Sequence, residues 1–151
     1  MKILFFVSNI GSYLHAEQII KILLDKCKEN KCILLLSGSC INKELNLPNL
    51  RIFRKEKFSR IELEEINNKN NFDNVFIGLT SYSDTEENFL CELCKAKRIP
   101  TWTLQDYPQY YGSFTKKIYP NFFLVLDKNS FEAIKIELPS TKVMQILSPK
   151  N

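Results

Sequence analysis

The stretch "SNIGSYLH" at residues 8–15 carries groups that could bind a ligand or react with it. Ser8, Asn9 and Ser12 offer hydrogen-bonding side chains. Gly11 would let the backbone come close to a ligand, and His15 could take a proton from a hydroxyl group. An ordinary turn in which Ser12 caps the next helix accounts for the same residues equally well. The stretch therefore predicts either a binding site or a capped turn.

The stretch "GLTSYSD" at residues 78–84 is a second candidate. Thr80 and Ser81 could form hydrogen bonds to a polar ligand. Ser83 and Glu86 have the spacing of a capping box, so helix capping is the more economical reading of this stretch. The G-x-S-x-G pattern of serine hydrolases is absent, which disfavours that chemistry.

The third candidate is the aromatic stretch "LQDYPQYYG" at residues 104–112. Asp106 directly follows an apolar run and could act as a base. The rings of Tyr107 and Tyr110 could stack on a sugar or contact a partner protein, or could fold over the core as a lid.

Cofactor and metal patterns are weak in this chain. Gly11 is one glycine where a dinucleotide fingerprint needs three, so we expect no NAD site. Cys91 and Cys94 form one C-x-x-C inside a helical pattern, with no second pair, so we interpret them as core residues and predict neither a zinc site nor any cofactor.

The elements that must position these residues alternate between apolar runs and helical patterns. We expect strands at residues 2–7, 32–38, 51–55, 74–80, 99–104, 122–127 and 142–147. We expect helices at residues 13–28, 59–66, 83–98 and 129–138, with "NNKNN" (67–71) as a turn. This alternation predicts one domain over residues 1–151, with an α/β, doubly wound, mainly parallel sheet of six to seven strands and helices on both faces.

Composition narrows the class of protein. A net charge of +4, spread along 151 residues, does not indicate nucleic-acid binding. No run approaches the roughly 18 apolar residues of a membrane span, and the five-residue apolar start is too short for a signal peptide. The five cysteines lie in apolar contexts that suit reduced thiols, so we predict a cytoplasmic protein.

Three stretches resemble the N-terminal half of GT-B glycosyltransferases and GT-B-like proteins. They are "FVSNIGSYLHAEQIIKIL", "NVFIGLTSYSDTEENFLCELCKAKRIPTWTLQDYPQYYG" and "FFLVLDKNSFEAIKIELPSTKVMQILSP". The resemblance implies a Rossmann-like domain on the acceptor side of a sugar transfer, with His15 or Asp106 as the base. It also implies a sugar or nucleotide-sugar ligand and a donor-binding partner domain or chain.

Two other functions remain open on the sequence. One is a non-catalytic binding module that holds a protein or a small anionic ligand through its aromatic loop. The other is a nucleoside deoxyribosyltransferase-like enzyme, to which the stretch "DTEENFLCELCKAKRIPTW" bears a faint resemblance. That resemblance would make Glu86 or Glu92 the nucleophile.

Overall fold

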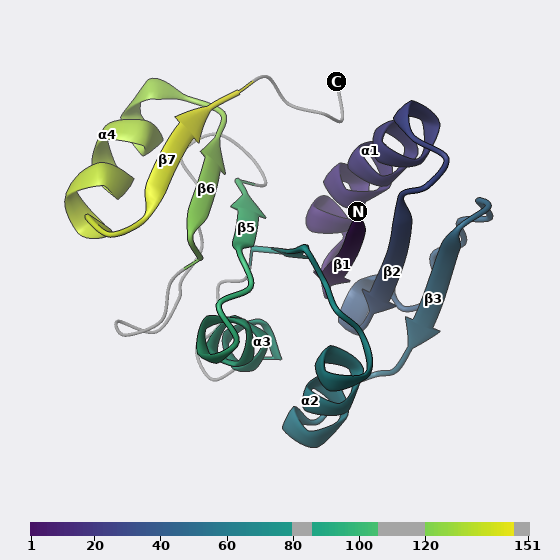
Figure 1. Cartoon of the computed structure of the whole chain (residues 1–151). Helices are drawn as coiled ribbons and strands as arrows, with labels where there is room; N and C mark the ends of the chain where they lie inside the picture. Colours follow the sequence, from purple (N-terminus) through teal and green to yellow (C-terminus); the bar gives the residue numbers. More distant parts are fainter. Residues whose placement is uncertain (80–85, 106–119, 147–151) are drawn as a thin grey trace.

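The computed structural model describes residues 1–79, 86–105 and 120–146 of the chain. Its centre is a seven-stranded sheet with the order β3-β2-β1-β4-β5-β6-β7 (Figure 1). Each pair of neighbouring strands runs parallel. The prediction of a doubly wound, parallel α/β sheet of six to seven strands is confirmed.

The strands match the predicted apolar runs, and most of them end one to three residues earlier than expected. They are β1 (Lys2–Val7), β2 (Lys31–Leu36), β3 (Leu50–Arg54), β4 (Asn74–Ile77), β5 (Thr101–Leu104), β6 (Phe122–Val125) and β7 (Lys142–Gln145). The central strands read as continuous apolar runs because both of their faces are buried.

Four α-helices and one short 3₁₀ turn connect the described strands. They are α1 (Ile10–Lys26), η1 (Gly38–Cys40), α2 (Arg60–Lys69), α3 (Glu86–Ala96) and α4 (Lys128–Glu137). Two predictions need correction. Helix α1 begins at Ile10 and not at residue 13, because Asn9 caps it. Helix α2 continues through Asn67 to Lys69, so most of the predicted turn at 67–71 is helical; Asn67 is buried there.

The helices are shared unequally between the two faces of the sheet. In Figure 1, α1 stands beside β1 and β2, α2 and α3 lie together, and α4 lies beside β6 and β7. A right-handed crossover from β1 back to β2 puts α1 on one face. The crossovers through α2, α3 and α4 advance along the sheet in the opposite direction, which puts these helices on the other face.

The packing of side chains agrees with this division. On the α1 face, Phe5, Val7 and Leu34 pack with Ala16 and Ile20 of the helix. On the opposite face, the sheet packs against α2 and α3 through a set of buried residues that includes Leu4, Phe6, Phe58, Leu63, Ile77, Leu90, Cys91 and Cys94. A third cluster joins α4 to β6 through Phe123, Val125 and Ile134. Within the described residues, no helix is both long enough and apolar enough to cross a lipid bilayer.

Candidate functional site

Strands β1 and β4 lie side by side at the centre of the sheet, and the chain leaves them toward opposite faces. After β1 it forms α1, and after β4 the next described element is α3 on the other face. In open parallel sheets, ligands bind at the carboxyl ends of the strands where the connections diverge in this way. We call the loops that follow β1, β2 and β4 the carboxyl edge.

Asn9 links the start of α1 to the residues that directly follow β4. Its side-chain Oδ1 accepts a hydrogen bond from the backbone N of Ser12 at 2.9 Å. This makes Asn9 the N-cap of α1, where the sequence suggested Ser12. The Nδ2 of Asn9 donates to the carbonyl oxygen of Leu79 at 2.8 Å, and the Ser12 Oγ lies 3.5 Å from the same oxygen. The side chains of Asn9 and Ser12, which the sequence predicted to bind a ligand, therefore form hydrogen bonds within the protein.

Two glycines allow the loops of the carboxyl edge to touch. Gly38 has a φ of +56°, and a Cβ at this position would lie 2.4 Å from the carbonyl oxygen of Ser8. At Gly78 a Cβ would lie 2.9 Å from the Cβ of Ser12 and 3.2 Å from the carbonyl oxygen of Phe6. Gly11, which we predicted would admit a ligand, is a half-buried residue in the first turn of α1.

The first turn of α3 brings two buried carboxylates to the carboxyl edge. The Oγ of Ser8 donates a hydrogen bond to the carboxylate of Glu87, and Glu87 is only 2% exposed. Glu86 accepts from the Oγ of Ser37 at 3.1 Å and from the backbone N of Phe58 at 2.7 Å. Negative charge is favoured at a helix N-terminus, so the position of both carboxylates on α3 is electrostatically favourable.

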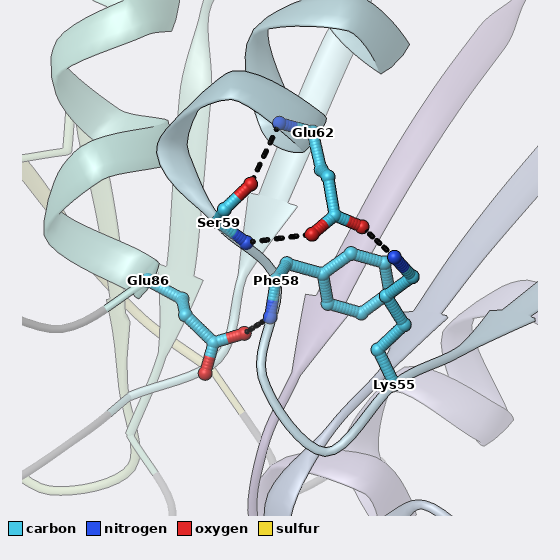
Figure 2. A network of polar contacts seen from close by, with 5 residues as sticks. All are labelled: Lys55, Phe58, Ser59, Glu62 and Glu86. Carbon is cyan, nitrogen blue, oxygen red and sulfur yellow. Dashed lines mark hydrogen bonds and ion pairs between the residues drawn. The ribbon is translucent and has the colours of Figure 1, made fainter.

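Figure 2 shows how the carboxylate of Glu86 reaches the loop that leads into α2. The predicted capping box at residues 59–62 is confirmed beside it. Ser59 Oγ accepts from the backbone N of Glu62 at 3.1 Å, and the backbone N of Ser59 donates to the Glu62 carboxylate at 3.3 Å. Lys55 also forms an ion pair with Glu62. The start of α2 is therefore tied both to its own first turn and to α3.

Burial raises the pKa of Glu86 above its ordinary value. The hydrogen bonds from Phe58 and Ser37 and the charge of Lys57 act in the opposite direction, and the neighbouring Glu87 adds to the rise. A raised pKa means that the carboxyl group holds its proton up to a higher pH than an exposed glutamate does. The same contacts also satisfy the amide of Phe58, which is a structural role.

His15 lies inside the protein. It is the sixth residue of α1, one turn later than the sequence suggested, and it is completely buried. A buried imidazole can exchange a proton only with groups packed against it. Several other predicted site residues lie outside the described residues: Thr80, Ser81, Ser83, Asp106, Tyr107, Tyr110 and Tyr111.

Cys91 and Cys94 pack on the sheet, as we interpreted them. Burial raises the pKa of Cys91 to about 11 and that of Cys94 to about 12, so both are protonated thiols at neutral pH. They belong to the cluster between the sheet and the helices α2 and α3. Within residues 1–79, 86–105 and 120–146, no three His, Cys, Asp or Glu side chains gather in a way that could hold a metal ion.

Sequence reasoning missed Glu87 and Ser37 as members of the carboxyl edge. Ser37 follows β2 just as Ser8 follows β1, so its position after a buried strand was an available signal. Glu86 entered the sequence predictions as a capping residue and as a nucleophile. Its predicted capping partner Ser83 lies outside the described residues, and the Glu86 carboxylate joins α3 to Ser37 after β2 and to the loop before α2. Glu92, the other proposed nucleophile, is half-exposed and pairs with Arg60 at 2.8 Å.

Comparison with known proteins identifies the fold. No protein-family model matches the sequence, and no curated protein matches it. Among solved structures, a UGT transferase from Siraitia grosvenorii in complex with UDP is similar, with a TM-score of 0.54 and 9% sequence identity. The two proteins share a fold. The match covers 96% of this chain and 50% of the transferase chain, so this chain spans half the length of that protein.

Proposed function

We propose that this chain is the acceptor-side half of a GT-B-type glycosyltransferase, which acts with a donor-binding domain or chain. The observation that carries the proposal is the match of almost the whole chain to half of a transferase that was crystallised with UDP. The carboxyl edge supports it, because it lies where α/β sheets of this type bind ligands. At 9% identity, the similarity to the transferase shows a shared fold, and the sugar transfer and the nucleotide-sugar ligand are what we propose.

The proposed reaction transfers a sugar from a nucleotide sugar to a hydroxyl group. The acceptor oxygen forms a bond to the anomeric carbon of the sugar, and the bond from that carbon to the phosphate oxygen of the nucleotide breaks. The hydroxyl proton passes to His15 or Asp106 as general base. Acceptor contacts would come from residues on the three loops that the sequence singled out: Ser8, Asn9, Gly11, Ser12, Thr80, Ser81, Tyr107 and Tyr110.

The buried position of His15 bears on its proposed role. For His15 to take the acceptor proton, the acceptor or a relaying group must reach it inside the domain. A donor-binding half that closes on the carboxyl edge would exclude water from this region, as is usual in group transfer.

The decisive experiment is reconstitution. The isolated chain should bind UDP-glucose weakly or not at all, as measured by calorimetry. Together with a donor-binding half expressed from the adjoining coding sequence, it should transfer radiolabelled glucose from UDP-glucose to a hydroxyl acceptor. Tight binding of UDP-glucose by the isolated chain would contradict the acceptor-side assignment.

The base is tested in the reconstituted enzyme with His15→Gln, which keeps a polar side chain of similar size. We expect a loss of about 10²-fold or more in kcat and loss of the acid-side limb of the pH profile, where the rate rises as the base gives up its proton. Glu92→Gln, a half-exposed position on α3, serves as the control and should leave kcat unchanged. An unchanged kcat in His15→Gln would remove His15 from the mechanism and leave Asp106 as the base to test.

The second candidate is a non-catalytic binding module with the same fold. It is favoured by the internal hydrogen bonds of Ser8, Asn9 and Ser12. This version predicts that replacing Tyr110 and Tyr111 with alanine abolishes a complex with the partner while the fold stays intact. A normal complex from the double variant would rule it out.

A further inference from the structure

A pocket at the amino ends of strands β1, β2 and β3 gathers positive charge. It lies at the opposite end of these strands from the carboxyl edge and has a volume of about 370 Å³. The described residues that line this amino-end pocket are Lys2, Lys31, Cys32, Ile33, Asn49, Leu50 and Arg51. Three of these side chains are cationic and none is acidic, so the pocket has the composition of a binding site for an anion.

The register of the sheet places the three cations on one face. Lys2 and Lys31 lie directly opposite each other on β1 and β2. Arg51 of β3 lies opposite Ile33, two residues after Lys31. Because side chains alternate between the faces of a strand, all three cations share the face on which Ile33 packs toward α2 and α3. Neighbouring strands are about 4.8 Å apart, so long side chains from β1 and β3 can meet at one small anion.

The three cations have no ion-pair partner among the described residues. The ion pairs there are formed by Lys21, Lys55 and Arg60. The carboxylate of Asp73 lies beside β1, where its Oδ2 accepts a hydrogen bond from the backbone N of Lys2 at 2.8 Å. Like charges directly opposite each other on neighbouring strands are unfavourable, and a bound anion would remove this repulsion.

Protection of the sheet edge explains only part of this charge. Cationic side chains often keep an edge strand from pairing with another chain. That explanation fits Arg51, because β3 is an edge strand. It does not fit Lys2 and Lys31, whose strands lie inside the sheet. The amino-end pocket therefore holds more positive charge than edge protection requires.

The position of Arg51 suits an anion with several oxygens. The carbon at the centre of its guanidinium lies over the ring of Phe53, 5.2 Å from the ring centroid. A guanidinium that rests on a ring still presents the N–H groups in its plane, which can donate to two oxygens of one phosphate. The ammonium groups of Lys2 and Lys31 act as point charges, so they can neutralise the same anion without a fixed direction.

We propose that the amino-end pocket binds the phosphate group of a phosphate monoester. Arg51 holds two of the phosphate oxygens, and Lys2 and Lys31 supply the remaining positive charge. A phosphate monoester carries close to two negative charges at neutral pH, which suits three cations better than a single carboxylate does. The pocket shares no residue with the carboxyl edge, so this proposal and the proposed sugar transfer succeed or fail separately.

The first experiment has two arms, because a phosphate monoester occurs both in solution and on a lipid headgroup. In one arm, the ¹⁵N-labelled chain is titrated with glycerol 3-phosphate while sodium chloride keeps the ionic strength constant. The backbone amide signals of Lys31, Cys32 and Arg51 should shift along one saturable curve. The other arm measures cosedimentation with phosphatidylcholine vesicles that contain phosphatidic acid. Binding in the first arm assigns a soluble ester, binding in the second arm alone assigns a lipid headgroup, and binding in neither overturns the proposal.

The matched variants are Arg51→Gln and Lys135→Gln. Each removes one positive charge from an exposed side chain that lies over an aromatic ring. Arg51→Gln should weaken binding by about tenfold or more, because it removes charge-assisted hydrogen bonds. Lys135→Gln, on α4, should bind as the original protein does. Lys31→Gln, at the exposed start of β2, provides a second test if Arg51→Gln does not fold.

Arg51→Lys separates hydrogen bonding from charge. It keeps the positive charge but loses the planar pair of donors, so binding should weaken by about threefold or more. Three results would overturn the proposal: unchanged binding in Arg51→Gln, equal losses in Arg51→Gln and Lys135→Gln, and unchanged binding in Arg51→Lys. The second of these would show that the phosphate responds to the net charge of the chain and not to the pocket.

Discussion

The two faces of the sheet differ in how many of the described helices pack on them. Three helices pack on one face, where Phe6 and Phe58 meet edge to face with 6.0 Å between ring centroids and are both buried. On the other face, α1 covers one part, and Trp102 and Phe122 stack while remaining partly exposed. The difference shows that the direction of each crossover, more than the apolar content of a strand, decides which side chains become core.

The largest expected effect comes from truncating the same residue type on each face. Phe6→Ala should lower the free energy of unfolding by about 3–5 kcal/mol, because it leaves a cavity in a closed cluster. Phe122→Ala should lower it by only roughly 1–2 kcal/mol, because this ring already contacts solvent. Urea unfolding followed by circular dichroism measures both. Equal losses would mean that the α1 face is as well covered as the other.

The second-largest effect is expected at Gly38, in the short turn η1 that follows β2. Gly38→Ala should lower the free energy of unfolding by about 2–3 kcal/mol, because it adds a Cβ against the Ser8 carbonyl and strains a left-handed backbone. Gly38→Asn separates the two causes, since asparagine tolerates the left-handed region but still carries a Cβ. If the close contact dominates, thermal unfolding will show equal losses. A nearly normal Gly38→Asn protein would show that the backbone angle dominates.

The smallest effect tests the buried charge on the three-helix face. Because burial raises the pKa of Glu86, the folded state holds its proton more tightly than the unfolded chain does. Its contribution to stability is therefore full at acid pH and is lost as the pH rises through the raised pKa. Glu86→Gln should be more stable than the original protein at neutral pH, and the difference should disappear as the pH falls below the ordinary pKa of a glutamate, about 4.3. Urea unfolding across this pH range measures it.

Glu92 on the same helix provides a control of opposite sign. The hydrogen bond and charge of Arg60 lower the pKa of Glu92, so its contribution is present at neutral pH and is lost on acidification. Glu92→Gln should therefore be slightly less stable at neutral pH. If both variants shift in the same direction, the stability change reflects the glutamine side chain and not the charge.

The central strands could be predicted because burial on both faces leaves a continuous run of apolar residues. Phe5 and Phe6 are consecutive and both fully buried, one on each face. The ends of the helices were harder to predict, because a polar residue can cap a helix, lie within it or form a turn. Asn9 caps α1 where Ser12 was expected, and Asn67 lies within a helix where an asparagine-rich turn was expected.

The partners at the carboxyl edge could not be predicted from the chain order. Glu86 meets Ser37 across 49 residues and Phe58 across 28, and these distances in sequence become contacts only through the strand order. The sequence did predict helices on both faces, but not their unequal number. That number follows from the handedness of each crossover together with the position of β1 between β2 and β4.

The strand order also has a consequence for the time course of folding. Except for β1 and β4, every pair of neighbouring strands is also consecutive along the chain, so those pairs close short segments. The β1 and β4 pair brings Lys2 to Asp73, which are 71 residues apart. On a growing chain, the inner edge of β1 must wait for β4 to be synthesised before its backbone hydrogen bonds can form. Closing this one long loop is the step that should set the folding rate.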